Sequence, residues 1–596
     1  MCGIAGIFSY ANDHPIDMAQ LERIEQAMIA RGPDGRGVWQ SDHGRIGLAH
    51  RRLAIIDPTP SGAQPMHDSQ RGLTITYNGE IYNYRELQEY LRSKGYELRT
   101  DSDTEVLLGL YAVDGPDMTN RLRGMFAFAI WDEQNRTCFA ARDPYGIKPF
   151  YYADQDGCLR FASTVKALMA GGDLPDDLDP AAQVGFLLLG YVPEPNTIRA
   201  AISSLPAGHS LTICEGGQPR IEEFCRITDL LRRPIEGPPP SLEERRERLR
   251  DALEDSVAHH MVADVPVGFF LSAGLDSTAL VSLAGRGGSV DAKTVTLCFD
   301  ATRGTRFDES ELAEMVGNAY GTEHHTVEIK QSDFAEDRDR VLAAMDQPST
   351  DGVNTYFVSK AVRSIGLKTA LSGAGGDEIL AGYESFDQIP RLVRRLRHVP
   401  GVATFGKGFR IVSGPLIRRL TSPKFAGLFE YGTTVADAYI LRRGLYMPWE
   451  LTSVLDPEII KSGWETLNLP GRLRHDSAGI GTLEGQVAAL EASWYLRGQL
   501  LRDADWAGMA NSLEIRVPFV DRVLLDRISD LVAGPARLTK QDLAALTDNR
   551  MPEAVRTRQK TGFHVPVRDW IAEGAENKPE RGLRGWARFL LDQVDA

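Results

Sequence analysis

The chain has 596 residues, so at roughly 100–200 residues per domain it should fold as more than one domain. Hydrophobic residues make up 42% of the chain and charged residues 25%, as is usual for a globular protein. Its 82 acidic residues outnumber its 67 lysines and arginines, for a formal net charge of −15. This balance argues against non-specific nucleic-acid binding, because neutralising phosphates requires a basic face.

The six cysteines are spread along the chain without a CxxC pair, at a density too low for a disulfide scaffold. We therefore expect free thiols, a reducing compartment and a cytoplasmic location. The segment after Met1 lacks the basic and long apolar regions of a signal peptide. The most apolar stretch, Val184–Val192, is shorter than a membrane span, so no membrane partner is expected.

The first 205 residues are predicted to form a β-rich domain. Apolar runs such as GIAGIF, LTITYNG and MFAFAIWD are separated by turn-forming segments such as RGPDG and PTPSG. Many of these runs are continuously apolar, which favours strands buried on both faces and hence two stacked sheets.

Residues 206–240 are interpreted as a linker, because the region ends in a stretch rich in proline and glycine. A helix is predicted to follow, with Ser241 as its N-cap and Glu244 completing a capping box. Apolar residues recur in it at helical spacing, at Leu242, Leu249, Leu253 and Val257.

The second domain is predicted over residues 241–596. Apolar strands (VGFFL, VTLCF, KTALS) alternate there with helical patterns, which indicates a parallel sheet wrapped by helices. From about residue 390 the chain becomes mostly helical and richer in arginine. The pair His324–His325 has no third ligand at a recognisable spacing, so no metal is assigned to it.

Cys2 is the first residue of interest for chemistry. If Met1 is removed, Cys2 carries a thiol and a free α-amine, which together suit a nucleophile with its own base. The octamer MCGIAGIF alone favours the other interpretation, a small buried residue at the start of a strand.

Two loops in the second half share one pattern. In FFLSAGLDSTAL and in LSGAGGDEILAGY, an apolar strand runs into a turn of small residues and then into a helix that begins near an aspartate. Backbone N–H groups at such turns bind anions, and the carboxyl ends of neighbouring parallel strands meet at one edge of the sheet. One aspartate from each loop is therefore placed to share Mg²⁺ on a pyrophosphate.

The motifs together resemble the glutamine-dependent asparagine synthetases. In order they are MCGIAGIF, RGPDG, HRRLAIID, YNGEIYNY, SDTE, RDPYGIKPFYY, SAGLDS, SGAGGDE, SLEIRVPFVD and KTGF. The resemblance implies a class II glutamine amidotransferase domain with an Ntn-hydrolase αββα fold over residues 1–205. It also implies an ATP-pyrophosphatase-type synthetase domain over residues 241–596, an α/β parallel sheet with a helical extension.

For the first domain, the resemblance implies that Cys2 attacks the carboxamide of glutamine, while the Asn78 side-chain amide and the Gly79 backbone N–H form the oxyanion hole. The remaining glutamine contacts that it implies are Arg52, at the α-carboxylate, and Glu80 and Asp103, at the amide and α-amino end.

For the second domain, the resemblance implies ATP binding by Leu271, Ser272, Gly274, Asp276, Ser277, Leu297, Ser372 and Gly373. Asp276 and Asp377 would hold Mg²⁺, and Lys560 would neutralise charge as an acyl-adenylate forms and breaks down. The implied partners are glutamine, ATP and a carboxylate acceptor such as aspartate, with ammonia passing between the sites and a homodimer as the assembly.

Two positions depart from the family pattern. Ala273 stands where the family usually has a glycine, and Ala374 stands where its asparagine-forming members usually carry an acidic residue. The second change leaves open that the chain amidates a different carboxylate, a sugar acid or a biosynthetic intermediate. An adenylating tRNA-modifying enzyme is disfavoured by the net charge, and a non-catalytic scaffold by the joint presence of the residues named above.

Overall fold

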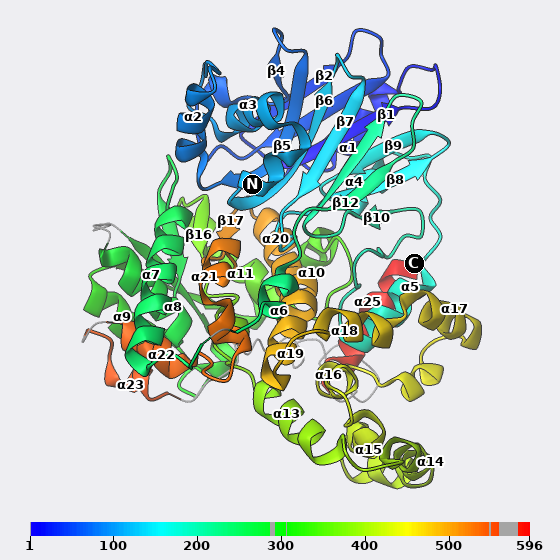
Figure 1. The fold of residues 1–596 in the computed structure, drawn as a ribbon, viewed down its shortest axis with the longest axis vertical. Coiled ribbons are helices and arrows are strands. Elements are labelled where there is room, and N and C mark those ends of the chain that lie inside the picture. Colours follow the sequence, from blue (N-terminus) through cyan, green and yellow to red (C-terminus); the bar gives the residue numbers. More distant parts are fainter. Residues whose placement is uncertain are drawn as a thin grey trace.

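The computed structural model describes residues 2–235, 237–286, 292–305, 307–547, 550–558 and 582–595. These residues form three sheets. Two antiparallel sheets of six strands lie at one end of the molecule, and a parallel sheet of five strands lies below them among helices (Figure 1).

The first sheet has the order β10-β8-β9-β1-β3-β2. Its strands are β10 (Ser203–Ser204), β8 (Tyr151–Gln155), β9 (Cys158–Ala162), β1 (Gly3–Ser9), β3 (Ile46–Arg52) and β2 (Gly35–Gln40). The second has the order β12-β11-β7-β6-β5-β4. Its strands are β12 (Arg220–Glu223), β11 (His209–Cys214), β7 (Thr137–Arg142), β6 (Gly124–Asp132), β5 (Leu73–Ile81) and β4 (Met66–Asp68).

Helices cover the outer faces of both sheets. The first sheet packs against α1 (Met18–Gln26) and α4 (Val165–Ala170), and the second against α2 (Tyr84–Ser93) and α3 (Asp103–Asp114). Between the sheets, Phe8 and Trp131 meet edge to face with ring centroids 5.1 Å apart. This layering confirms the αββα architecture expected from the sequence.

The segment that was interpreted as a linker differs from expectation at its start. β11 and β12 lie within residues 206–240, and β11 pairs with β7 along its whole length. Leu211 and Ile213 alternate with polar residues and face the core, which is the pattern of a half-buried strand. The chain leaves the sheet only after Glu223 and then forms α6 (Ile227–Arg232).

The third sheet has the order β15-β14-β13-β16-β17, and all its described pairings are parallel, as predicted. Its strands are β15 (Glu323–Ile329), β14 (Lys293–Phe299), β13 (Val267–Phe270), β16 (Thr369–Leu371) and β17 (Glu514–Arg516). The helices around it are α7 (Leu242–His260), α8 (Leu275–Arg286), α9 (Ser310–Tyr320), α10 (Gln331–Ala344), α11 (Val353–Ser364), α21 (Arg522–Ala533), α22 (Lys540–Leu546) and α23 (Glu553–Arg556).

The N-cap prediction for α7 is confirmed, since the Ser241 hydroxyl oxygen accepts the Glu244 N–H at 3.2 Å. Leu249, Leu253 and Val257 are buried, as their spacing predicts. Leu242 is 48% exposed, because the first turn of the helix lies beyond the packed surface.

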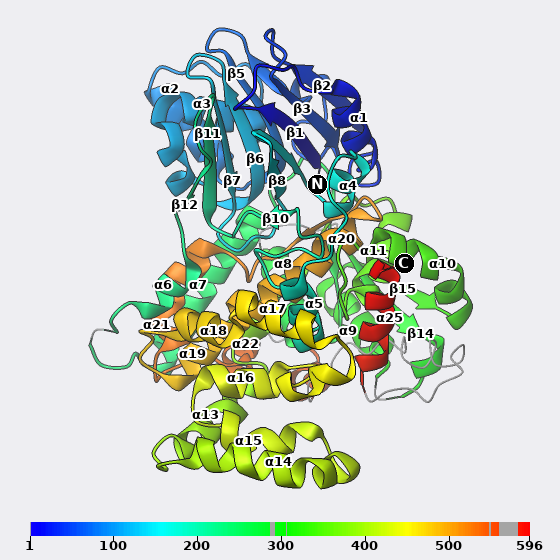
Figure 2. The same cartoon turned by 90° about the vertical axis from the view of Figure 1, so that its right-hand side faces the viewer.

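The helical extension follows the fourth strand of this sheet in chain order, β16. Its elements are α12 (Gly376–Ile379), α13 (Ser385–Leu396), α14 (Val402–Leu420), η4 (Pro423–Gly427), α15 (Leu428–Tyr431), α16 (Val435–Arg443), α17 (Pro457–Leu467), α18 (Leu469–Ser477), α19 (Leu483–Leu490), the π-helical η6 (Glu491–Leu501), α20 (Arg502–Met509) and α25 (Arg584–Asp595). Seen from the side, α14 and α15 form the end of the molecule opposite the sandwich (Figure 2).

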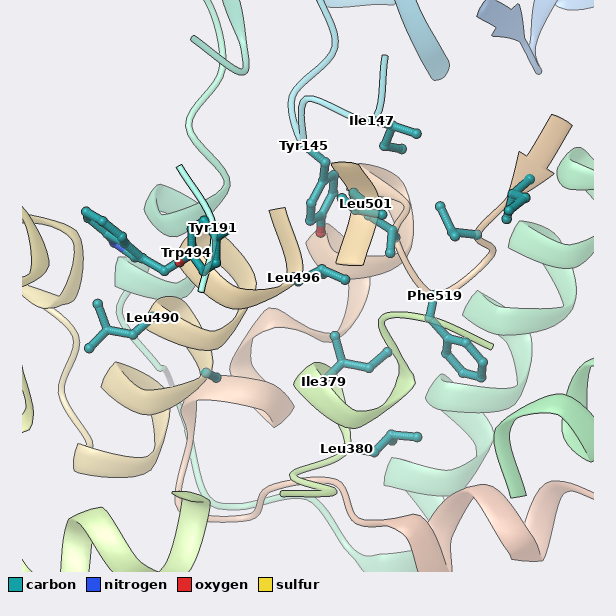
Figure 3. Close-up of a cluster of buried hydrophobic side chains, with 14 of the residues drawn as sticks. Tyr145, Ile147, Tyr191, Ile379, Leu380, Leu490, Trp494, Leu496, Leu501 and Phe519 are labelled. Carbon is teal, nitrogen blue, oxygen red and sulfur yellow. The ribbon is translucent and has the colours of Figure 1, made fainter. Parts of the chain in front are cut away.

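The two halves share one large apolar core. Helix α5 (Pro180–Leu189) precedes the expected linker, yet it packs on α17 of the second half. In the same core, Tyr145 and Ile147 from the loop after β7 lie beside Leu501 of η6 (Figure 3). The two halves therefore meet through packed side chains.

Among the described residues, no helix is both long enough and apolar enough to cross a bilayer.

Candidate active sites

The first site lies where the two sheets of the sandwich meet. Cys2 is 8% exposed, and its backbone N–H donates to Oδ1 of Asn78 at 2.9 Å. Its thiol sulfur lies 3.9 Å from the carbonyl oxygen of Leu53. Burial raises the pKa of this thiol above its ordinary value. A buried thiol with a raised pKa requires a base in order to act as a nucleophile, and from the sequence we expect the Cys2 α-amine to be that base if Met1 is removed.

Asn78 shows how the sequence-predicted oxyanion hole is held. It lies on β5 and is fully buried, and its Oδ1 is occupied by the Cys2 N–H. Its Nδ2 has no hydrogen-bond partner among the described residues. A buried amide donor without a partner is costly unless a ligand satisfies it. Gly79 follows directly, and a Cβ there would lie 2.1 Å from the carbonyl oxygen of Met125, so the position requires glycine.

Arg52 is brought close to Cys2 by strand pairing. In the antiparallel register of β1 with β3, Gly3 is opposite Arg51, which places Arg52 at the level of Cys2. Its guanidinium donates to the Thr59 carbonyl at 2.8 Å. Gly62 faces this guanidinium, and a Cβ there would lie 2.2 Å from its Nη2. A guanidinium that donates to backbone carbonyls on one side can donate its remaining N–H groups to a carboxylate.

Asp103 begins α3, where Ser102 caps the helix by accepting the Thr104 N–H at 3.2 Å. Its carboxylate accepts from the Tyr77 hydroxyl at 3.0 Å and from the Ile81 N–H at 3.1 Å. Burial raises the pKa of Asp103 to about 6, although these hydrogen bonds favour the ionised form.

Glu80 lies two residues after Asn78 and therefore on the same face of β5. Its Oε2 lies 3.3 Å from Nη2 of Arg516, which comes from β17 of the second half. Arg516 is fully buried and also binds Glu514, with Nε and Oε1 2.6 Å apart. Burial and the neighbouring Glu514 carboxylate raise the pKa of Glu80 well above its usual value. The acidic residue expected at the glutamine site thus also touches the synthetase half.

A second link joins the nucleophile to the other half. Nε of Arg31 donates to the Cys2 carbonyl at 3.1 Å, and its two terminal nitrogens bind the Asp505 carboxylate of α20 at 2.7 and 2.9 Å. Both side chains are less than a tenth exposed. Burial lowers the pKa of Arg31, but the Asp505 carboxylate more than offsets this, so the guanidinium stays charged. We call this three-residue connection, Cys2–Arg31–Asp505, the interface strut.

The second site lies at the carboxyl edge of the parallel sheet. β13 and β16 are neighbours, with Phe269 opposite Leu371, so the two loops that follow them lie side by side. Each loop begins with a serine whose hydroxyl oxygen accepts the N–H two residues on at 3.3 Å: Ser272 from Gly274, and Ser372 from Ala374. The repeated sequence pattern thus forms the same type of turn after both strands.

Small residues allow these loops to meet. A Cβ on Gly373 would lie 2.9 Å from Cβ of Asp276, and one on Gly376 would lie 2.6 Å from its Oδ1. The Ser277 hydroxyl donates back to the Ser272 carbonyl at 2.7 Å. Leu271 and Leu297 are buried beneath the loops. The structure thus brings together the sequence-predicted ATP-binding residues of both loops.

Lys540 stands between the two aspartates that were predicted to bind Mg²⁺. Its Nζ donates to Oδ1 of Asp276 and lies 2.9 Å from Oδ1 of Asp377. Burial lowers the pKa of this amine, but the two carboxylates raise it above its ordinary value overall. Because both carboxylates point at one cation, the pair fits a divalent metal that also takes phosphate oxygens from a substrate.

A cavity of about 180 Å³ lies beside the second loop. Its wall includes Asp351, Arg443 and Tyr495. The Arg443 guanidinium stacks on the rings of Tyr495 and Tyr383, 3.8 and 4.4 Å from their centroids. The Tyr383 hydroxyl in turn donates to Glu378, next to Asp377, at 3.0 Å. Arg443 also binds the buried Glu491 carboxylate, with Nη2 2.8 Å from Oε2, so its charge at this cavity is already paired.

Sequence reasoning missed Arg31, Asp505, Lys540 and Arg516. Arg31 and Arg516 lie within the motifs RGPDG and SLEIRVPFVD, which could have indicated a role. Asp505 and Lys540 act through tertiary contacts, and no local pattern identifies them. Lys560 lies outside the described residues, as does Met1.

Two family models match the chain. A model described as a glutamine amidotransferase domain matches residues 1–224, and one described as asparagine synthase matches residues 248–587.

Curated relatives match over nearly the full length. The chain is 33% identical to "Asparagine synthetase [glutamine-hydrolyzing] 1" of Bacillus subtilis, over 100% of this chain and 91% of that protein. It is 29% identical to "Asparagine synthetase [glutamine-hydrolyzing] 3" of the same organism, with the same coverage. A "Putative asparagine synthetase [glutamine-hydrolyzing]" of Mycobacterium tuberculosis is 32% identical over 96% of this chain and 89% of its own. The chain therefore belongs to the glutamine-hydrolysing asparagine synthetase family and is a glutamine-dependent carbon–nitrogen ligase with ATP as a substrate.

Proposed function

We propose that the chain makes asparagine from aspartate, using ATP and the amide nitrogen of glutamine. The observation that carries this proposal is the pairing of a complete nucleophile site with a carboxylate-and-lysine site in one packed molecule. The two halves that carry these sites are joined by the interface strut and by the Glu80–Arg516 contact.

In the first site, Cys2 attacks the glutamine carboxamide, and its freed amine takes the thiol proton and returns it to the leaving ammonia. The Asn78 Nδ2, which has no partner among the described residues, and the Gly79 N–H stabilise the developing oxyanion. Arg52 holds the α-carboxylate, while Asp103 faces the α-ammonium. Charge stabilisation by one such donor typically contributes about 3 kcal/mol.

In the second site, Asp276 and Asp377 hold Mg²⁺, which when bound would neutralise the phosphates of ATP. The turns at Ser272 and Ser372 present backbone N–H groups to the same phosphates. Lys540 bridges both carboxylates and is placed to stay with the departing pyrophosphate. Lys560 is proposed, from the motif alone, to neutralise charge on the acyl-adenylate.

Ammonia would travel between the sites through the apolar interface. Leu53 and Ile55 next to Cys2 cluster there with Met509 of α20. An apolar route disfavours protonation of ammonia and excludes water from the adenylate. The six cysteines are all free, which supports a reducing, cytoplasmic location. The expected homodimer stays a prediction.

The identity of the acceptor depends on the second loop, where Ala374 stands in place of the family's usual acidic residue. The nearby cavity presents the Asp351 carboxylate, which suits an acceptor that carries an ammonium group, while its Arg443 guanidinium already binds Glu491. This favours aspartate, or a larger compound with an amino-acid head group, over a sugar acid.

Pyrophosphate release from ATP tests the proposal directly. The full-length protein is incubated with a panel of aspartate, glutamate, an amino-acid-bearing biosynthetic intermediate such as diaminopimelate, and a sugar acid such as galacturonate. Each is tried with glutamine and with ammonium. Release with aspartate and appearance of asparagine support the proposal. Release with another carboxylate alone transfers the same two-site chemistry to that acceptor, and release with none contradicts it.

A further inference from the structure

The helix α14 has one packed face and one bare face. Of its residues only Gly406 is buried, against α15, where a Cβ would lie 2.3 Å from the backbone nitrogen of Glu430. The helix rests on η4 and α15, and both views place it at the extremity of the molecule (Figures 1 and 2). The bare face is therefore accessible without any rearrangement of the sandwich or of the parallel sheet.

Large apolar side chains occupy the bare face. Their exposed fractions are 83% for Val412, 76% for Leu420, 63% for Phe405, 62% for Ile411 and 61% for Leu416. At helical spacing, Phe405, Val412, Leu416 and Leu420 form one stripe along the helix, and Ile411 lies about 120° round from it at the far edge of the bare face. Single exposed apolar residues need no explanation, but five on one face of one helix indicate an interaction surface.

The surrounding charge is entirely basic. Residues 388–429 contain nine lysines and arginines and no aspartate or glutamate, although the whole chain carries a net charge of −15. Arg394 and Arg410 pair with glutamates outside this stretch, and Lys424 donates to the carbonyl oxygen of Arg442.

Three basic side chains on the bare face of α14 have no ion-pair partner among the described residues. Lys407, Arg418 and Arg419 are exposed and make no ion pair with any residue that the structure describes. At helical spacing Arg419 lies beside the apolar stripe, whereas Lys407 and Arg418 lie next to Ile411 at the other edge of the bare face. The bare face thus presents apolar and basic groups together.

We propose that the bare face of α14, the stripe together with these three cations, docks the protein on an anionic lipid bilayer. A helix that exposes both large apolar side chains and Lys or Arg lies in the interface plane, with its apolar side chains among the acyl chains and its cations at the headgroups. Each cation near an anionic membrane surface contributes about 1 kcal/mol. This mode of attachment needs no spanning helix, and it goes beyond the proposed amide synthesis.

The charge and the placement of the helix favour a bilayer over a second copy of the chain. A symmetric dimer through this face would bring two basic surfaces together, and like charges across an interface are unfavourable. A protruding convex helix can touch a flat surface along its length, whereas a protein partner would need a matching acidic groove.

Vesicle co-sedimentation of the full-length protein tests the proposal. At low salt, we expect binding to vesicles of phosphatidylcholine mixed with phosphatidylglycerol, and about a hundredfold weaker binding to phosphatidylcholine alone. The triple variant Val412→Ser, Leu416→Ser, Leu420→Ser should bind the mixed vesicles at least about tenfold more weakly. Replacing Lys407, Arg418 and Arg419 by Gln should weaken the same binding by about a hundredfold.

The matched control is Val113→Ser with Ile221→Ser, two exposed apolar residues of the sandwich at 37% and 41% exposure. It should bind as the unchanged protein does. Circular dichroism and glutamine hydrolysis, which should be unchanged in every variant, show that each is folded. Absence of binding to any vesicle would overturn the proposal, as would binding that the α14 variants leave intact. Self-association that the serine variant abolishes, without vesicle binding, would overturn it in favour of a second copy.

Discussion

The glutamine site and the adenylation site are held in different ways. In the first, hydrogen bonds between neighbouring residues hold the side chains: the Cys2 N–H binds Asn78, and Asp103 binds Tyr77 and Ile81, while the Asn78 Nδ2 has no partner among the described residues. In the second, two carboxylates converge on Lys540. Strand register and hydrogen bonds position the groups of the first site, whereas in the second two carboxylates share one lysine, a contact that the proposed Mg²⁺ and phosphates would have to displace. The nucleophile site is thus fixed by the fold alone, while the charged site depends on its proposed ligands.

Removal of the Cys2 thiol should give the largest difference between glutamine-driven and ammonium-driven amide formation. Cys2→Ala should lower glutamine-driven amide formation by at least about 10⁴-fold, because no other group can form the acyl-enzyme. Ammonium-driven formation should stay within about twofold, since the adenylation site is untouched. Product formation with each nitrogen source measures both effects. Cys138→Ala, a buried thiol in β7, is the control and should retain both activities. Equal loss of both activities in folded Cys2→Ala would contradict two separate sites.

Loss of one metal-facing carboxylate should give the opposite pattern. Asp276→Asn should lower ATP-dependent pyrophosphate release by about 10³-fold, because the charge that balances Lys540 and the metal is halved. Basal glutamine hydrolysis should persist. Parallel assays of pyrophosphate and glutamate measure the two outcomes. Retention of pyrophosphate release would show that Asp276 does not face the phosphates.

Removal of the oxyanion donor should weaken the first site without destroying it. Asn78→Ala should lower kcat for glutamine hydrolysis by about 10²- to 10³-fold, since one of two donors is lost. Steady-state glutaminase assays measure this. A rise in KM with unchanged kcat would instead indicate that Asn78 binds the ground state and the transition state equally.

The interface strut links Cys2 to the second half of the chain, and its removal should cost stability as well as activity. Asp505→Asn should lower the free energy of unfolding by about 3 kcal/mol, because it leaves the Arg31 guanidinium buried without its counter-charge. Glutamine hydrolysis should fall about tenfold as Cys2 loses its support. Denaturant unfolding and glutaminase assays measure these changes.

A matched exposed pair gives the control for the strut. Asp530→Asn breaks the Arg248–Asp530 pair, in which both side chains are 34% exposed, and should cost under about 1 kcal/mol. The double variant Arg31→Met, Asp505→Leu should recover part of the stability lost in Asp505→Asn. Equal costs for the two single variants would contradict a role for the strut in stability.

The smallest effect concerns pH. Since burial raises the pKa of Asp103 to about 6, the carboxylate is ionised above that pH and neutral below it. The value of kcat/KM for glutamine should therefore fall as pH drops through about 6, about tenfold per unit, because the α-ammonium loses its partner. Rate profiles from pH 5 to 8 measure this. In Asp103→Asn the inflection should vanish, and its persistence would assign the titration to another group.

Motifs and patterning were sufficient to predict much of the fold. Continuous apolar strands predicted the two stacked sheets, and the repeated serine turn predicted that Asp276 and Asp377 meet at one edge. Residues 206–224 were harder, because a short alternating strand such as β11 is recognisable only by the partner it pairs with.

Contacts between the halves could not be predicted. The Arg31–Asp505 pair joins residues 474 positions apart, and Lys540 reaches Asp276 across 264 positions. Only the packing of the complete chain decides which charges meet at such separations.

The central claim is that nitrogen released at Cys2 is used at the adenylation site of the same molecule. Amide-labelled ¹⁵N-glutamine, ATP, Mg²⁺ and the acceptor that supports pyrophosphate release are combined with an excess of unlabelled ammonium. Mass spectrometry of the product then gives the source of its amide nitrogen. We predict a product labelled almost entirely from glutamine, whereas label diluted to the ratio in bulk solution would contradict the claim.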